Sequence, residues 1–327
     1  MSISQLGLAF VAFLLSAAVL RPGLRLLDLG VPDGPHATEG FDTPVIGGIA
    51  LWCALAVTWL LRPSGIDMPA LGLGLIALRL LAAPGERDPR WTNAAMLLVD
   101  LIVCAALLQM RDGEALDLRS VLTILSGVAL LQGVFRLRSL DGLGALVLCI
   151  ALAALASLTS GSARWLASTG AAAATGLLVL NLPLRFNRVW RIRSGQGGAA
   201  LLALVFGVAA MLARSGTEAT SPGPMHLLWL LPLPCCELLA VLARRPTSHQ
   251  RLLDAGFSVT AIFLLYAAMS ALPALVLIAS PGLPPPALLA SVFIALVLLW
   301  FVVVWQAPRL MWLLPWRLRR IDVVHKD

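Results

Sequence analysis

The stretch Gly142–Ser160 reads GLGALVLCIALAALASLTS and contains no charged residue. Its length falls in the range of roughly 17–25 apolar residues that a helix needs to cross the hydrocarbon core of a bilayer. Leucine and alanine dominate it, without the alternation of apolar and polar residues that marks a barrel strand. Because a backbone in lipid must satisfy its hydrogen bonds internally, the stretch predicts a transmembrane helix.

Similar apolar runs recur along the whole chain, which is 59% hydrophobic and 13% charged. A typical soluble domain is about 25% charged, so a single water-soluble core does not account for this composition. The pattern predicts an all-α, polytopic membrane bundle that forms one transmembrane domain over residues 1–327. We predict about eleven spans, at 3–20, 44–61, 68–84, 92–110, 120–135, 142–160, 165–184, 197–213, 224–243, 255–279 and 286–308.

The basic residues predict how the bundle is oriented. Most of the 24 lysines and arginines fall in the loops after the first, third, fifth, seventh and ninth spans, or in the C-terminal tail. Because basic loops face the cytoplasm, we expect the N-terminus outside and the C-terminus in the cytoplasm. The net charge of +7 is spread along this face. It therefore favours anionic headgroups and phosphorylated ligands over nucleic acid.

Five polar segments follow one another on the predicted cytoplasmic face. They are VPDGPHATEGFDTPVIGG (31–48), GERDPRW (85–91), FRLRSLDGL (135–143), NLP with RVWRIRSGQG (181–183 and 188–197), and TSHQRLLDAGFS (247–258). In this order they resemble the motifs of the polyprenyl-phosphate N-acetylhexosamine-1-phosphate transferases. This integral membrane family includes the enzymes that initiate bacterial O-antigen and peptidoglycan lipid intermediates.

The first segment resembles the family loop that contains Asp-x-Pro, a basic pair, His-x-Gly and Pro-x-x-Gly-Gly. It keeps Pro32, Pro44, Gly47 and Gly48, but it lacks the basic pair, and Thr38 stands at the histidine position.

The next two segments have partly lost the family's carboxylates. Where the family has adjacent aspartates, this chain has Glu86 and Arg87, with Asp88 one residue later. In the third segment Arg138 stands at the first aspartate of the family pattern, whereas Asp141 is retained before glycine and leucine.

The last two segments keep some of the family's binding groups. Asn181 matches the family's Asn-x-Pro, and Arg188 the arginine that follows it, whereas Arg193 replaces a metal-binding aspartate. The final segment retains His249 and Arg251 of a stretch that normally has three histidines.

The resemblance implies transfer of a sugar phosphate from a UDP-sugar to undecaprenyl phosphate, with release of UMP, in the synthesis of cell-envelope glycans. It implies Asp141, Glu86 and Asp88 as catalytic carboxylates, and Mg²⁺ as the cofactor, although the sequence names no metal ligands. Arginine cannot coordinate a cation, so Arg138 and Arg193 put both Mg²⁺ and turnover in doubt. The residues implied in substrate binding are Asn181, Arg138, Arg188, Arg193, His249, Arg251, Gly47 and Gly48.

Two further kinds of protein remain alternatives. A non-catalytic homologue would use the arginines to bind lipid phosphate, or would act as a scaffold, and a homodimer is compatible with either function. A transporter would need inverted repeats or paired broken helices near the midplane, and the sequence indicates neither.

Several candidate residues also have ordinary structural interpretations. Asp141 precedes an apolar run and is equally typical of a helix N-cap. Arg188 beside Trp190 is typical of an anchor at the membrane interface. His249 is expected to be solvated in its loop, and Glu237, inside a predicted span, is expected to pair helices through its polar group.

Overall fold

A computed structural model of the chain describes residues 3–26, 30–31, 43–44, 47–60, 98, 101–102, 104–105, 125, 127–134, 137, 142–181, 195–214, 224–243, 245–280 and 284–310. The regular elements of these ranges are helices, apart from a short antiparallel ribbon. In this ribbon Gly30–Val31 (β1) pairs with Thr43–Pro44 (β2). The predicted all-α class is therefore confirmed for the described residues.

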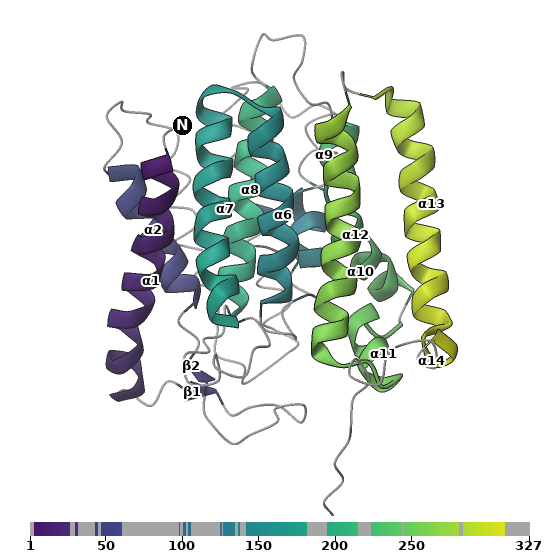
Figure 1. The fold of residues 1–327 in the computed structure, drawn as a ribbon, viewed down its shortest axis with the longest axis horizontal. Coiled ribbons are helices and arrows are strands. Elements are labelled where there is room, and N and C mark those ends of the chain that lie inside the picture. The colour runs from purple at the N-terminus through teal and green to yellow at the C-terminus, as the bar shows by residue number, and fades with distance from the viewer. Residues whose placement is uncertain are drawn as a thin grey trace, which may run out of the picture.

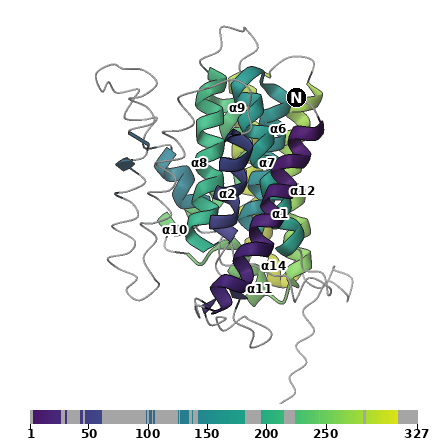
Figure 2. The ribbon, with the colours of Figure 1, turned by 90° about the vertical axis from the view of Figure 1, so that its left-hand side faces the viewer.

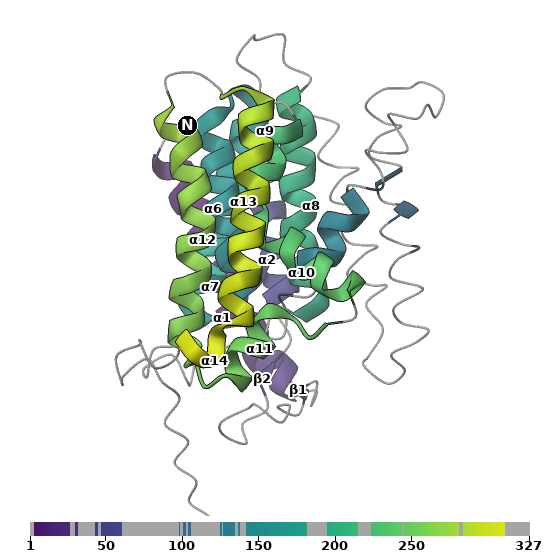
Figure 3. The same cartoon turned by 90° about the vertical axis from the view of Figure 1, so that its right-hand side faces the viewer.

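The long helices run side by side in one bundle (Figure 1). They are α1 (Ile3–Leu26), α2 (Gly47–Leu60), α6 (Leu143–Leu158), α7 (Gly161–Asn181), α8 (Gly195–Arg214), α12 (Val259–Ala279) and α13 (Pro286–Trp305). In the first half of the bundle α1 and α2 lie against α7, and α2 also contacts α8 (Figure 2). In the second half α12 packs on α6, and α13 lies on the outside (Figure 3).

Three of these helices, α7, α12 and α13, are long and apolar enough to cross a membrane. α2, with 14 residues, and α6, with 16, are apolar but shorter than a full span. The predicted span 68–84 and most of 92–110 lie outside the described residues. The described part therefore supports a membrane protein, and the prediction of about eleven spans stays a prediction.

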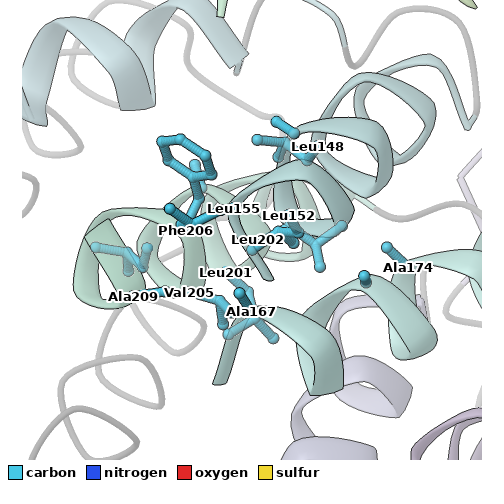
Figure 4. Packing of buried hydrophobic residues seen from close by; sticks show 14 of the residues in the cluster. Leu148, Leu152, Leu155, Ala167, Ala174, Leu201, Leu202, Val205, Phe206 and Ala209 are labelled. Atoms are coloured by element: carbon cyan, nitrogen blue, oxygen red, sulfur yellow. The ribbon is translucent and has the colours of Figure 1, made fainter. Parts of the chain in front are cut away.

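Small side chains let α6, α7 and α8 approach closely around one apolar core (Figure 4). A Cβ atom on Gly170 of α7 would lie 2.6 Å from Cγ1 of Val205 on α8 and 3.2 Å from Cδ1 of Leu152 on α6. A Cβ on Gly176 would lie 2.5 Å from Cδ1 of Phe13 on α1. The Gly- and Ala-rich segment 170–176 is a helix-packing surface, as its composition predicts.

Replacing Gly176 with alanine is expected to destabilise the bundle by about 1–3 kcal/mol, because the new methyl group overlaps the stiff ring of Phe13. Gly207→Ala on α8 is the matched control, since no atom lies within 4 Å of its added Cβ. There the gain in helix propensity is expected to leave stability unchanged or raised by up to ~1 kcal/mol. Thermal unfolding of the two purified variants compares them, and equal melting temperatures would contradict the packing argument.

The predicted span 224–243 is interrupted. It forms α9 (Pro224–Trp229) and α10 (Pro232–Leu242), separated by Leu230 and Leu231. The amides of Leu230 and Leu231 donate to carbonyls three residues earlier, which tightens the end of α9. Pro232 begins α10, where its missing N–H costs nothing. The indole of Trp229 donates to the carbonyl of Pro273 on α12 at 2.8 Å, so the break is fixed to a neighbouring helix.

One end of the bundle gathers segments that are far apart in the sequence (Figures 1 and 3). We call it the α11 end, after the short helix α11 (Ser248–Asp254); it also contains β1, β2 and α14 (Ala307–Leu310). α2 begins there and α13 ends there. The N-terminus lies at the opposite end (Figure 1). The described parts of the loops that are predicted to be cytoplasmic therefore lie at one end of the bundle.

Candidate functional site

A buried carboxylate ties α10 to α11 and α12 near this end. Glu237 of α10 is fully buried, and its Oε1 accepts a hydrogen bond from the hydroxyl of Tyr266 on α12 at 2.6 Å. Its Oε2 accepts from the backbone N–H of Ser248, the first residue of α11, at 3.1 Å. The prediction that Glu237 pairs helices through its polar group is confirmed by the bond to Tyr266.

Two further side chains extend this arrangement. The indole of Trp300 on α13 donates to Oγ of Ser248 at 3.1 Å, and the rings of Trp300 and Tyr266 meet edge to face with centroids 5.0 Å apart. His249 lies with Nδ1 at 3.7 Å from Oε1 of Glu237. We call these five residues, Glu237, Ser248, His249, Tyr266 and Trp300, the Glu237 cluster. It joins four helices by polar contacts inside an apolar region.

His249 is not a solvated loop residue. It lies in α11, its side chain is completely buried, and its Nε2 is 3.2 Å from Oγ1 of Thr247. Apolar side chains of α11 and α12, including Leu252 and Phe263, form a buried cluster at this end with Leu143 of α6. The expectation of solvation was wrong because α11 folds back under the bundle. The predicted role of His249 in substrate binding stays a prediction, and its burial favours positioning α11 over direct contact with a ligand.

Arg251 is held against the end of α13. Its Nε–H donates to the carbonyl of Val304 at 3.1 Å, in the last turn, where helix carbonyls lack intrahelical partners. Its guanidinium also lies over the ring of Trp305, 4.7 Å from the centroid. A cation at this position is favourable for the helix dipole as well. Arg251 thus stabilises the end of α13, whatever else it binds.

Asn181 and Gly142, which belong to two different predicted motifs, contact one another. A Cβ on Gly142 would lie 2.9 Å from Cβ of Asn181 and 3.5 Å from Cζ of Phe263. Asn181, the last residue of α7, is fully buried, and its Nδ2 donates to the carbonyl of Leu177 at 3.1 Å. Its Oδ1 accepts no hydrogen bond from the described residues. A buried amide oxygen without a donor is costly.

The N-cap interpretation of Asp141 needs a correction. α6 begins at Leu143, and the residue at the N-cap position is Gly142, with φ +88° and no capping side chain. Glycine is required there because the left-handed conformation and the contact with Asn181 both exclude a Cβ. Asp141 is one residue further upstream and lies outside the described residues.

The other predicted site residues are placed only in part. Gly47 and Gly48 begin α2 at the α11 end. Outside the described residues lie Glu86, Asp88, Arg138, Asp141, Arg188 and Arg193. Whether the carboxylates converge on the arginines therefore stays a prediction.

Sequence reasoning missed the partners of Glu237. Tyr266 is 29 residues away and is the chain's single tyrosine, and Trp300 is 52 residues from Ser248. The pairing with Tyr266 could have been predicted from the sequence, because a tyrosine and a glutamate each lie inside an apolar span, where polar groups usually pair with one another.

The described residues bring together no group of three or more histidine, cysteine, aspartate or glutamate side chains that could hold a metal ion. His249 and Glu237 alone make too few ligands for Mg²⁺, which prefers several oxygens in octahedral geometry. We therefore derive no step that uses a metal. Among known proteins, no family model matches this chain, and no curated protein is detectably similar to it.

Proposed function

We propose that this chain is a bacterial inner-membrane protein of the polyprenyl-phosphate sugar-1-phosphate transferase type, acting in cell-envelope glycan synthesis. Its substrates in this proposal are undecaprenyl phosphate and a UDP-sugar, which bind at the α11 end on the cytoplasmic side. The contact between Asn181 and Gly142 carries the proposal, because the two residues belong to separate motifs of the resemblance and lie against one another. The side chain of Asn181 is fully buried there, and its Oδ1 accepts no hydrogen bond from the described residues.

The position of the other motifs supports the same proposal. The Gly47–Gly48 pair and the segment of His249 and Arg251 lie at the end where Asn181 meets Gly142. In the proposed reaction the lipid phosphate attacks the pyrophosphate of the nucleotide sugar, so negative charge accumulates. Arg138, Arg188 and Arg193 would hold these phosphates through charge-assisted hydrogen bonds, while Asp141 would assist in deprotonating the lipid phosphate.

A non-catalytic homologue that binds lipid phosphate is the second candidate. It is favoured over a working transferase by the complete burial of His249, which leaves that side chain unexposed to a nucleotide sugar in this conformation. Arginine at positions 138 and 193, where the family binds metal, favours it as well.

The exchange of labelled UMP into UDP-sugars, measured in membranes that contain the full chain, tests the first candidate. A working transferase is expected to catalyse exchange that Asp141→Ala abolishes, because the retained carboxylate is then lost. No exchange with any metal or sugar tried would reject it. The second candidate predicts the opposite pattern, in which exchange is absent and Asp141→Ala leaves the cellular function intact.

A further inference from the structure

Two arginines share one exposed tryptophan at the end of α13. Trp305 is the last residue of the helix, and 56% of its surface is exposed. The guanidinium carbon of Arg251 lies 4.7 Å from the centroid of its indole ring, and that of Arg245 lies 5.4 Å away. Both distances are within the range of a cation–π interaction. Both positive charges are therefore held against the same aromatic side chain.

Among the described residues, no acidic group balances these two charges. Within the described residues no carboxylate lies in salt-bridge distance of Arg245 or Arg251; the single pair at that distance there is His249 with Glu237. Asp254 at the end of α11 is exposed and unpaired in the described part, and Glu237 is buried. Arg251 uses its Nε–H on the carbonyl of Val304. A guanidinium has five N–H donors, so its two terminal amino groups remain able to bind an anion.

The helix that leads to this pair of arginines has the surface of a lipid-facing helix. The most apolar 18-residue stretch within Ala287–Trp305 has a mean hydropathy of 3.0, and only 22% of that stretch is buried inside the protein. α13 lies on the outside of the bundle, and its lower end meets α11 and α14 (Figure 3). In its last two turns Leu298, Leu299 and Val302 are exposed. Trp305 thus lies between the apolar surface of α13 and the two arginines, which is the position that tryptophans take at membrane interfaces.

We propose that Arg245, Arg251 and Trp305 form a binding site for the phosphate of an anionic membrane phospholipid, whose acyl chains lie along the exposed face of α13. The two guanidinium groups supply hydrogen bonds and charge to the phosphodiester. The exposed leucines and valine supply the apolar contact, which a soluble phosphate would not use. This site differs from the proposed polyprenyl phosphate site in Arg245 and Trp305, which the resemblance does not involve, and it shares Arg251 with the substrate-binding residues that the resemblance implies. Phospholipid binding here does not depend on transferase activity.

The test is to count bound phosphatidylglycerol on the detergent-purified full chain by native mass spectrometry, with phosphatidylcholine as the neutral comparison. Arg245→Gln is the decisive variant, because Arg245 is exposed and its contact in the described part is with the Trp305 ring. It is expected to weaken phosphatidylglycerol binding about fivefold, equivalent to ~1 kcal/mol for one basic residue at an anionic surface. Arg164→Gln, an exposed arginine near the start of α7 at the opposite end, is the matched control and is expected to change nothing.

Two more measurements test the role of the Trp305 ring and distinguish a phospholipid site from a site for soluble phosphate. Trp305→Leu keeps an apolar side chain but removes the ring that holds the guanidinium groups, so it is also expected to weaken binding. Glycerol phosphate is the soluble probe, and it is expected to compete poorly with the lipid. The proposal is overturned if Arg245→Gln and Arg164→Gln bind equally, if phosphatidylcholine binds as well as phosphatidylglycerol, or if glycerol phosphate displaces the lipid at matching concentration. Melting temperatures of all variants show whether each remains folded.

Discussion

Replacing Glu237 with alanine is expected to lower the free energy of unfolding by about 2–6 kcal/mol, because two buried donors lose their acceptor. The change leaves the Tyr266 hydroxyl and the Ser248 N–H without their acceptor in a fully buried region. Each unsatisfied donor costs about 1–3 kcal/mol. Thermal or denaturant unfolding of the purified full chain measures the effect, and α11 is expected to lose protection from proteolysis first.

The control for Glu237 is Asp254→Ala, which removes an exposed carboxylate at the end of α11 and is expected to shift stability by less than ~0.5 kcal/mol. Tyr266→Phe removes the hydroxyl that donates to Glu237 and so tests the same hydrogen bond. In a double-mutant cycle, Glu237→Ala and Tyr266→Phe are expected to be non-additive, because both remove the same hydrogen bond. Additive effects, or equal stability of the Glu237 and Asp254 variants, would show that the cluster does not stabilise the fold.

Replacing Gly142 with alanine is expected to destabilise the fold by about 2–5 kcal/mol. Its φ of +88° is unfavourable for any residue with a Cβ, by about 1–2 kcal/mol. The added methyl group would also lie 2.9 Å from Cβ of Asn181, so the start of α6 must move away from the end of α7. Overlaps of this kind cost about 1–3 kcal/mol. Unfolding of the purified variant gives the total.

Gly161→Ala separates the two contributions. Gly161 also has a positive φ, +56°, but no atom lies within 4 Å of its added Cβ, so only the conformational cost of about 1–2 kcal/mol is expected. Asn181→Gly in the Gly142→Ala background removes the overlapping Cβ and is expected to restore part of the stability. If Gly142→Ala and Gly161→Ala are equally destabilising, the contact with Asn181 is not a constraint on the bundle.

The sequence predicted the parts of the fold that depend on local pattern. The runs that contain α1, α6, α12 and α13 are apolar over enough residues to require a helix in lipid. The break between α9 and α10 was not predicted, although Pro232 and Pro234 lie inside the run. A hydropathy profile does not distinguish a proline that begins a new helix from one that kinks a continuous helix. The break is also held by the hydrogen bond from Trp229 to the carbonyl of Pro273 on α12, which a local pattern does not reveal.

The candidate site was less predictable, because its contacts join residues that are far apart in the sequence. The contact of Asn181 with Gly142 was not predicted, because no local rule relates two residues at the ends of different helices. The burial of His249 depends on α11 packing beneath α12 and α13, which the polar sequence of residues 247–251 does not indicate. Glu237 was singled out correctly, since a carboxylate in an apolar span needs a polar partner, but its partner had to come from the fold.

The connection between α6 and α7 bears on the order in which the bundle assembles. Only Thr159 and Ser160 separate the two helices, so closing this loop costs little chain entropy, and the contacts that follow are near in sequence. Pairings of this kind form faster than those between distant segments. We therefore expect the hairpin of α6 and α7 to form before the contacts of these helices with α1, α8 and α12.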